Sequence, residues 1–364
     1  MTKEELKLPF YAKATILFVG LIALVTILYI GKGIIVPLVF ATIIAILLSP
    51  LVNFLVRIHI NRVIAIAVTL FLTFLVIFAF GSLFFSQAGR FSESVPLLVD
   101  KFSAIINQII NDASGYLDKD PQKIHAWVTK TQSEIINIST AAIGQTLVIL
   151  GSALVILFLL PVYIFLILFY QPIILEFIHR LFKEGNQGQV SEIITQTKTV
   201  IQRYLTGLVI EAVIVAALDT IALLILGIEY ALLLGIIGAL LNIIPYIGGL
   251  VAVSLPMIVA IVTKSSPFYA LYVLAAYYFI QIIDNNYVVP KIVASKVKIN
   301  ALFSIVAIIA GNVLWGIPGM FLSIPLLAIV KLICDHIEPL KPWGFLLGDT
   351  MPPLIKVKTI LKKK

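Results

Sequence analysis

The stretch EYALLLGIIGALLNIIPYIGGLVAVSLPMIVAIVTK, residues 229–264, has no charged side chain between Glu229 and Lys264. One continuous helix over this run would be roughly 50 Å long, whereas the hydrocarbon core of a bilayer is about 30 Å thick. Two complete spans would need roughly 40 residues and a turn. The run is too long for one span and too short for two. Its central Pro245-Tyr-Ile-Gly248-Gly249 therefore predicts two half-length helices that form a re-entrant hairpin.

A second uncharged run, residues 299–330, repeats this pattern and is broken at Trp315-Gly-Ile-Pro318-Gly319. Each run follows an apolar span that carries acidic groups, so 203–264 and 266–331 are the same span–hairpin unit in opposite orientations. A break of this kind frees backbone carbonyls and amides, which must face protein or a water-filled cavity. Paired broken helices in inverted units are typical of a transporter's binding site.

The composition of the whole chain indicates a membrane protein. Its 364 residues are 61% hydrophobic and 12% charged, and the mean hydropathy is +1.11. A soluble domain is about half apolar and a quarter charged. The net charge of +8 does not indicate nucleic-acid binding, because the positive charges lie between the apolar runs and at the ends, where they orient helices. We therefore expect an all-α polytopic membrane protein that contacts the lipid bilayer and no nucleic acid.

About eight hydrophobic segments predict six full spans plus two re-entrant hairpins in an inverted repeat. The full spans are expected at 14–30, 34–56, 63–86, within 143–170, 204–227 and 268–288. The distribution of Lys and Arg predicts that both termini lie in the cytoplasm. If both uncharged runs crossed the membrane once instead, the chain would have eight spans. Lys291, Lys296 and Lys298 would then lie outside, against the positive-inside tendency.

Five domains are expected along the chain. They are N-terminal spans (1–86), an extracytoplasmic amphipathic helical arm (87–142), span four with cytoplasmic amphipathic helices (143–202), a transport core (203–335) and a cytoplasmic basic tail (336–364). In the arm, apolar residues at helical spacing predict one helix over 95–113 and a second from Pro121 to about 137. The arm is either an oligomerisation element or a folded loop on the bilayer.

Two groups of polar residues in the predicted spans are candidates for ligand or ion binding. Glu211 and Asp219 are eight residues apart, so they share roughly one helix face. They are either a proton or sodium relay or a structural hydrogen-bonding pair. Gln281, Asp284 and Asn285 fall at i, i+3 and i+4, also on one face. They suit a polyhydroxylated ligand or a cation, unless they only mark a polar helix end.

The two predicted hairpin tips complete the candidate site. Their residues are Asn242, Pro245, Gly248 and Gly249 in the first hairpin and Asn312, Pro318 and Gly319 in the second. Free backbone groups there could bind ligand directly, or the small residues could serve close helix packing.

Enzyme chemistry is not expected. The four histidines are scattered, and the chain has no H-E-x-x-H, no G-x-S-x-G and no phosphate-binding glycine loop with lysine. We therefore expect no catalytic residue, no metal site, no cofactor and no ATP-driven step. A gradient or facilitated efflux must drive any transport.

Three segments carry a resemblance to a known family. They are residues 226–249, the pattern Gln281-x-x-Asp284-Asn285-x-x-Val-Val-Pro290-Lys291, and Gly316 to Pro325 followed by Glu338-Pro-Leu. Together they resemble the autoinducer-2 exporter family of bacterial membrane permeases. That resemblance implies a homo-oligomeric transporter, a pentamer, in the bacterial inner membrane. Some members of the family are associated with export of the quorum-sensing signal autoinducer-2, and others with sodium/proton antiport.

The expected function is export of a small polar solute, with autoinducer-2 as the candidate, by alternating access of 203–331 against a scaffold of 1–170. One alternative is a monovalent cation/proton antiporter that uses Asp219 and Asp284. A further alternative is a non-transporting membrane scaffold built on the amphipathic arm.

Overall fold

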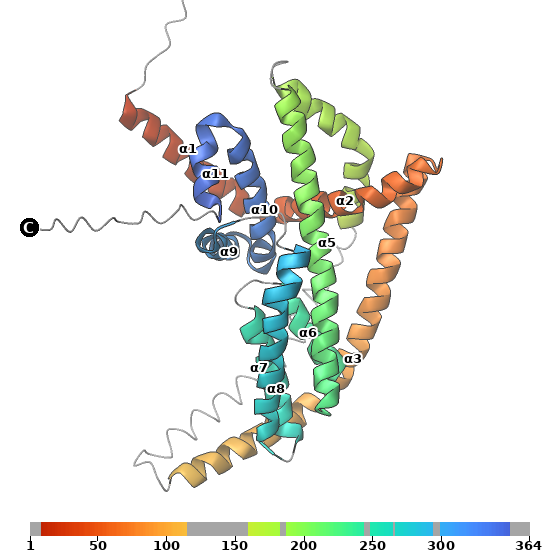
Figure 1. Cartoon of the computed structure of the whole chain (residues 1–364), viewed down its shortest axis with the longest axis vertical. Coiled ribbons are helices and arrows are strands. Elements are labelled where there is room, and N and C mark those ends of the chain that lie inside the picture. The colour runs from red at the N-terminus through yellow and green to blue at the C-terminus, as the bar shows by residue number, and fades with distance from the viewer. Residues whose placement is uncertain are drawn as a thin grey trace, which may run out of the picture. The chain divides into compact units, whose positions relative to one another are not determined.

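The computed structural model describes residues 9–114, 159–182, 187–243, 248–264, 266–293 and 299–349. These residues are helical apart from short connections (Figure 1), which confirms the predicted all-α membrane fold. The helices are α1 (Phe10–Ile30), α2 (Lys32–Arg57), α3 (Arg62–Ser114), a helix over Leu159–Leu181, α5 (Gln187–Ile225), α6 (Ala231–Asn242), α7 (Gly248–Thr263), α8 (Phe268–Ile283), α9 (Ala301–Trp315), α10 (Ile317–His336) and α11 (Lys341–Leu347), with a π-helical segment η2 (Asp284–Val293) and a 3₁₀ turn η3 (Glu338–Leu340).

In the described part of the chain, five helices are long and apolar enough to cross a bilayer. They are Lys32–Arg57, Arg62–Ile105, Leu159–Leu181, Gln187–Ile225 and Ile317–His336. Large apolar side chains on their outer faces are exposed, for example Phe78 on α3 and Ile225 on α5. Apolar surface on this scale is what lipid, not water, covers. The protein is a multi-pass membrane protein, and the count of six spans with two re-entrant hairpins stays a prediction.

Helix α3 differs from the sequence-based expectation. The pattern predicted a span ending near residue 86 and a separate helix over 95–113, but one continuous helix covers Arg62–Ser114. The intervening residues hold one glycine, Gly89, which costs a helix only about 1 kcal/mol relative to alanine. The first arm helix is therefore an extension of α3, with Pro96 inside it. The second predicted arm helix lies outside the described residues.

Helix α5 merges two predicted elements in the same way. An amphipathic cytoplasmic helix and the fifth span were expected to be separate, yet α5 runs unbroken from Gln187 to Ile225. No proline or glycine lies between Gln189 and Thr206, so nothing ends the helix there.

The chain forms two compact units. The first comprises Met1–Val36, Glu176–Tyr204 and Ala294–Lys364, and the second comprises Pro37–Leu175 and Leu205–Val293. The α6–α7 pair thus belongs to the second unit and the α9–α10 pair to the first.

The second unit has two apolar cores. One core is formed by α5, α6, α7 and α8 together, and its fully buried residues include Leu223, Leu234 and Val273. The other joins α2, α3 and the helix Leu159–Leu181, where small side chains such as Ala41 and Ala65 let the helices approach closely.

The first uncharged run is broken where the sequence predicted. Helix α6 ends at Asn242 and α7 begins at Gly248, while Pro245 lies outside the described residues. A Cβ atom at Gly248 would lie 2.0 Å from the Leu241 carbonyl oxygen. The two helices therefore meet backbone to backbone, and only glycine fits.

The second uncharged run is broken at Gly316, whose φ of 70° requires glycine. Helices α9 and α10 then pack closely: a Cβ atom at Gly319 would lie 2.0 Å from the Gly311 carbonyl oxygen. The Ser323 hydroxyl lies 2.8 Å from the Ala307 carbonyl oxygen across the pair. At the break, Trp315 Nε1 donates to the Leu28 carbonyl of α1 at 3.0 Å.

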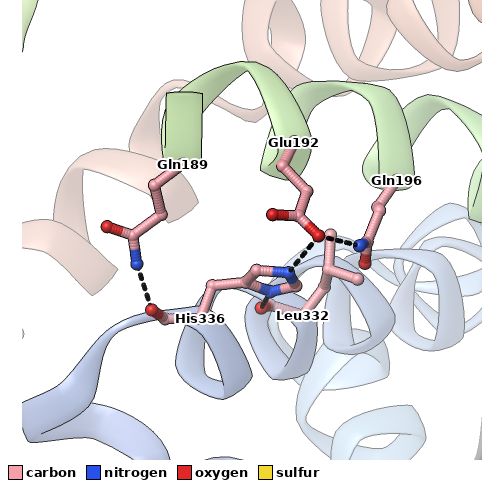
Figure 2. A network of polar contacts seen from close by, with 5 residues as sticks. All are labelled: Gln189, Glu192, Gln196, Leu332 and His336. Carbon is pink, nitrogen blue, oxygen red and sulfur yellow. Dashed lines mark hydrogen bonds and ion pairs between the residues drawn. The ribbon is translucent and has the colours of Figure 1, made fainter. Parts of the chain in front are cut away.

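A polar network in the first unit ties the start of α5 to the end of α10 (Figure 2). The Gln189 amide donates to the backbone carbonyl of His336. Glu192 accepts from Gln196 Nε2 at 2.9 Å, and its carboxylate lies 3.9 Å from His336 Nε2. The other ring nitrogen, Nδ1, lies 2.8 Å from the Leu332 carbonyl oxygen. The amphipathic beginning of α5 is thus held against the second hairpin.

Candidate functional site

Asp284 is the centre of a buried polar cluster in the second unit. It is 2% exposed and lies where α8 passes into η2. Asn242 Nδ2, at the end of α6, donates to Asp284 Oδ2 at 2.9 Å, and Gln281 Nε2 approaches the same oxygen at 3.5 Å. The other oxygen, Oδ1, is buried and has no hydrogen-bond partner among the described residues. This carboxylate therefore keeps one acceptor open.

The local fold explains why these side chains gather. Beyond Ile283 the helix widens into the π-helical segment η2, which contains Pro290. Segments of this kind are frequent at functional sites because they re-aim side chains within a helix. Gln281 Nε2 also lies 3.5 Å from Asn285 Oδ1, so the predicted grouping of Gln281, Asp284 and Asn285 on one face is observed.

Asp219 forms a second acidic position on α5. It is 2% exposed. A Cβ atom at Gly238 of α6 would lie 2.9 Å from Asp219 Oδ2 and 3.6 Å from the Tyr277 hydroxyl of α8. Side chains from α5 and α8 thus meet at the backbone of α6, and a side chain at position 238 would displace the Asp219 carboxylate. The Tyr277 hydroxyl is buried without a hydrogen-bond partner in the described part of the chain.

Glu211 completes a set of three buried acids. It is 7% exposed and lies on α5, as Asp219 does. Asp284 is close enough to interact electrostatically with both. At Gly207, one helical turn before Glu211, α5 packs directly on η2: a Cβ atom at Gly207 would lie 2.7 Å from the Ile292 carbonyl oxygen. No lysine, arginine or histidine of the described residues forms an ion pair with any of the three acids.

The first hairpin contributes its tip to this cluster. A Cβ atom at Gly249 would lie 2.6 Å from Gln281 Oε1 and 3.5 Å from Asn242 Oδ1. Gly249 thus keeps space open beside the two amides, while the buried Gly248 serves the close approach of α6 and α7.

The candidates in the second hairpin belong to the other compact unit. There Gly319 packs on α9, the Asn312 carbonyl accepts from Gly316 N at 2.8 Å, and Pro318 stands in the first turn of α10. These contacts pack α9 closely against α10, and a role of the three residues in ligand binding stays a prediction.

Sequence reasoning missed two residues of the cluster, Gly238 and Tyr277. A weak signal existed for each. Gly238 follows Gly235 by one helical turn, a spacing that favours close packing against a neighbouring helix. Tyr277 precedes Gln281 by four residues and Asp284 by seven, so it lies on the polar face of α8.

The arrangement is suited to protons, monovalent cations or hydroxyl-rich solutes. Carboxylate and amide oxygens accept hydrogen bonds and bind hard cations, and the amide nitrogens donate. Among the described residues, no group of three His, Cys, Asp or Glu side chains is placed to hold a metal ion.

Comparison with known proteins assigns the chain to a family. The model of the AI-2E transporter family matches residues 18–338. YrrI of Bacillus subtilis, named provisionally as a transport protein, is 22% identical over 84% of this chain and 87% of its own length. The AI-2 transport protein TqsA of Escherichia coli K12 is 24% identical over 87% of this chain and 90% of its own length. YueF of Bacillus subtilis, also a provisional transport protein, is 33% identical over 35% of this chain and 34% of its own length. The match over most of the chain, together with the membrane fold, shows that this protein belongs to the AI-2E family of transporters.

Proposed function

We propose that this membrane transporter exports a small polar solute and that a proton or a monovalent cation bound at the acid cluster drives the export. One observation carries the proposal: Asp284 is buried, is held through one oxygen by Asn242, and keeps its other oxygen unpartnered among the described residues. A charged group that is buried without a partner destabilises the folded protein by roughly several kcal/mol. A cation that binds at Asp284 relieves this destabilisation and its release restores it, so the penalty can be coupled to a transport cycle.

The acids on α5 extend this site. Asp219 and Glu211 are buried near Asp284 without a basic partner among the described residues, so three negative charges cannot coexist there at low cost. Cation or proton binding at one acid therefore changes the affinity of the others.

The solute of this proposal is small and rich in hydroxyl groups, and autoinducer-2 is the candidate. Asn242, Gln281 and Asn285 offer both amide donors and carbonyl acceptors, which such a solute requires. The relative TqsA, named as an AI-2 transport protein, supports the same substrate. The proposal includes alternating access at the α6–α7 tip, a homo-oligomer in the bacterial inner membrane, and cytoplasmic termini.

A second candidate is monovalent cation/proton antiport without an organic solute. The set of three buried acids favours it, because antiport needs only cation-binding groups. A non-transporting scaffold would not require this cluster, so the cluster lends that alternative no support.

Flux in proteoliposomes tests the proposal. Labelled autoinducer-2 and internal pH are followed in parallel, with and without a sodium gradient, for the wild type, Asp284→Asn and Asp219→Asn. Asp100→Asn is the matched control, because Asp100 is an exposed acid on α3. We expect Asp284→Asn to abolish gradient-driven solute flux while Asp100→Asn retains it.

The wild type could instead show a sodium-driven pH change without solute flux, and Asp284→Asn could lose that pH change. This result would favour the antiporter over the exporter. Full solute flux in Asp284→Asn would overturn the role of the acid cluster.

A further inference from the structure

Helix α11 carries an exposed apolar surface that the transport site does not use. Trp343, Phe345 and Leu346 are 60%, 61% and 47% exposed, whereas Gly344 between them is buried. The three exposed side chains form the α11 apolar face. Exposed apolar surface that is concentrated on one short helix, here seven residues long, marks a site of contact with a membrane or another protein.

The helix is firmly attached to the first unit. A Cβ atom at Gly344 would lie 2.2 Å from Asp335 Oδ1 and 3.0 Å from Asp335 N, so α11 lies directly against the last turn of α10. Asn300 N donates to the Leu347 carbonyl at 2.9 Å, and Ile299 and Gly348 form an antiparallel β-bridge. Helix α11 is therefore fastened both to the end of α10 and to the residues that lead into α9.

These attachments define the position of α11 along the second hairpin. The Gly311–Gly319 and Ala307–Ser323 contacts show that α9 and α10 run antiparallel from the break at Gly316. The start of α9 and the end of α10 therefore lie together at the open end of the hairpin, and the contacts of Gly344 and Leu347 place α11 there too.

The open end is also where charge begins. Residues 299–330 have no charged side chain. The first charged groups after them pair with each other, Lys331 with Asp335 at 2.6 Å and Lys341 with Glu338 at 2.5 Å. The change from an uncharged hairpin to paired charges marks the level at which hydrocarbon gives way to headgroups and water. The α11 apolar face lies at that boundary.

We propose that α11 is an interfacial anchor whose apolar face inserts into the phospholipid headgroup region beside the second hairpin. Tryptophan is enriched at this depth, because its ring is largely apolar while its indole N–H is polar, and Phe345 and Leu346 add apolar surface beside it. The chain from Lys341 onward supplies a second attraction, since it contains six lysines and one aspartate. That charge attracts anionic lipids and would repel a second copy of the same segment.

Tryptophan fluorescence tests this inference independently of any transported solute. The chain has three tryptophans, Trp127, Trp315 and Trp343. The variant Trp127→Phe/Trp315→Phe keeps Trp343 as the sole reporter. It is reconstituted into phosphatidylglycerol vesicles that contain lipids brominated either near the headgroup or near the chain end. We expect stronger quenching by the shallow bromines, and weaker quenching when Lys356, Lys358 and Lys362–Lys364 are changed to Gln.

The matched control keeps Trp315 instead, through Trp127→Phe/Trp343→Phe. Trp315 is at the closed end of the hairpin, so the tail lysines should not affect its quenching. If loss of the Trp315 hydrogen bond prevents folding, Leu346→Cys in a Cys334→Ser background carries an environment-sensitive fluorophore at the same face.

Quenching of Trp343 by aqueous iodide and by neither brominated lipid would overturn the inference, because the face would then be in water. Insensitivity to lipid and iodide alike would also overturn it, since another protein surface, such as a second copy, would then cover the face.

Discussion

The substitution Gly319→Ala probes the closest approach in the second hairpin. An ideal Cβ atom there would lie 2.0 Å from the Gly311 carbonyl oxygen, 2.7 Å from its carbonyl carbon and 2.9 Å from Trp315 Cβ. The two nearest atoms are backbone, so no change of rotamer can relieve the clash. Ordinary van der Waals contact begins at 3.4 Å. Helices α9 and α10 would have to separate by about 1.4 Å in a closely packed interior.

The cost follows from that separation. Overpacking of a well-packed interface costs about 1–3 kcal/mol. The movement also stretches the Ser323–Ala307 hydrogen bond between the helices, which in a membrane is worth about 0.6 kcal/mol. Alanine returns about 1 kcal/mol of helix propensity relative to glycine. We expect a net loss of about 2 kcal/mol of unfolding free energy.

Thermal unfolding of the purified protein in one detergent measures this loss. Gly20→Ala is the matched control, because nothing lies within 4 Å of a Cβ atom at Gly20 in α1. That control should unfold at or above the wild-type temperature, and Gly319→Ala clearly below it. If Gly319→Ala unfolded as late as Gly20→Ala, the two helices would not be in backbone contact and the reasoning would be refuted.

Three further predictions test other contacts. Gly238→Ala places a methyl group 2.9 Å from Asp219 Oδ2, so transport in proteoliposomes should fall. The control Gly81→Ala, where nothing lies within 4 Å of the new Cβ atom, should transport normally. Equal flux in the two variants would show that Gly238 is not part of the site. Tyr230→Phe loses the 2.6 Å hydrogen bond with Ser94 but keeps the edge contact with Phe91, so chemical unfolding should show a loss of about 1 kcal/mol. Adding Ser94→Ala to Tyr230→Phe should cost little more, and an additive double variant would argue against the bond. Glu192→Gln weakens the contact with His336, in which the Glu192 side chain is 60% exposed, and should lower the unfolding free energy by less than about 1 kcal/mol. A larger loss in the same unfolding assay would show that the network in Figure 2 contributes more to stability.

Several features of the fold were predictable because they depend on local composition. The membrane class follows from the apolar runs, since lipid tolerates few charges. The breaks near Gly248 and at Gly316 follow from glycine and proline that cluster within a few residues, whereas the isolated Pro256 and Pro325 stay inside helices. The shared face of Gln281, Asp284 and Asn285 follows from helical periodicity, although the π-helical form of the next turn was not visible in it.

The sequence pattern does not predict the unbroken helices α3 and α5, because a change of polarity along the chain looks the same whether a helix ends there or continues into another environment. A helix ends where its backbone cannot continue, and neither Glu93 in α3 nor Arg203 in α5 stops the helix from continuing. The site residues Gly238 and Tyr277 were missed for a different reason. Neither is polar enough, or rare enough in a membrane helix, to stand out alone.

Hydropathy, periodicity and helix breaking are properties of neighbouring residues, so the amino-acid sequence alone predicts a bilayer-embedded helical protein with two broken apolar runs and acids inside its spans. The three-dimensional fold adds that α6 presents Asn242 to Asp284 and leaves room at Gly238 for Asp219. It also adds that the two hairpins belong to different compact units. Which oxygen finds a donor and which stays open depends on contacts between residues far apart in the chain, and no local pattern records them.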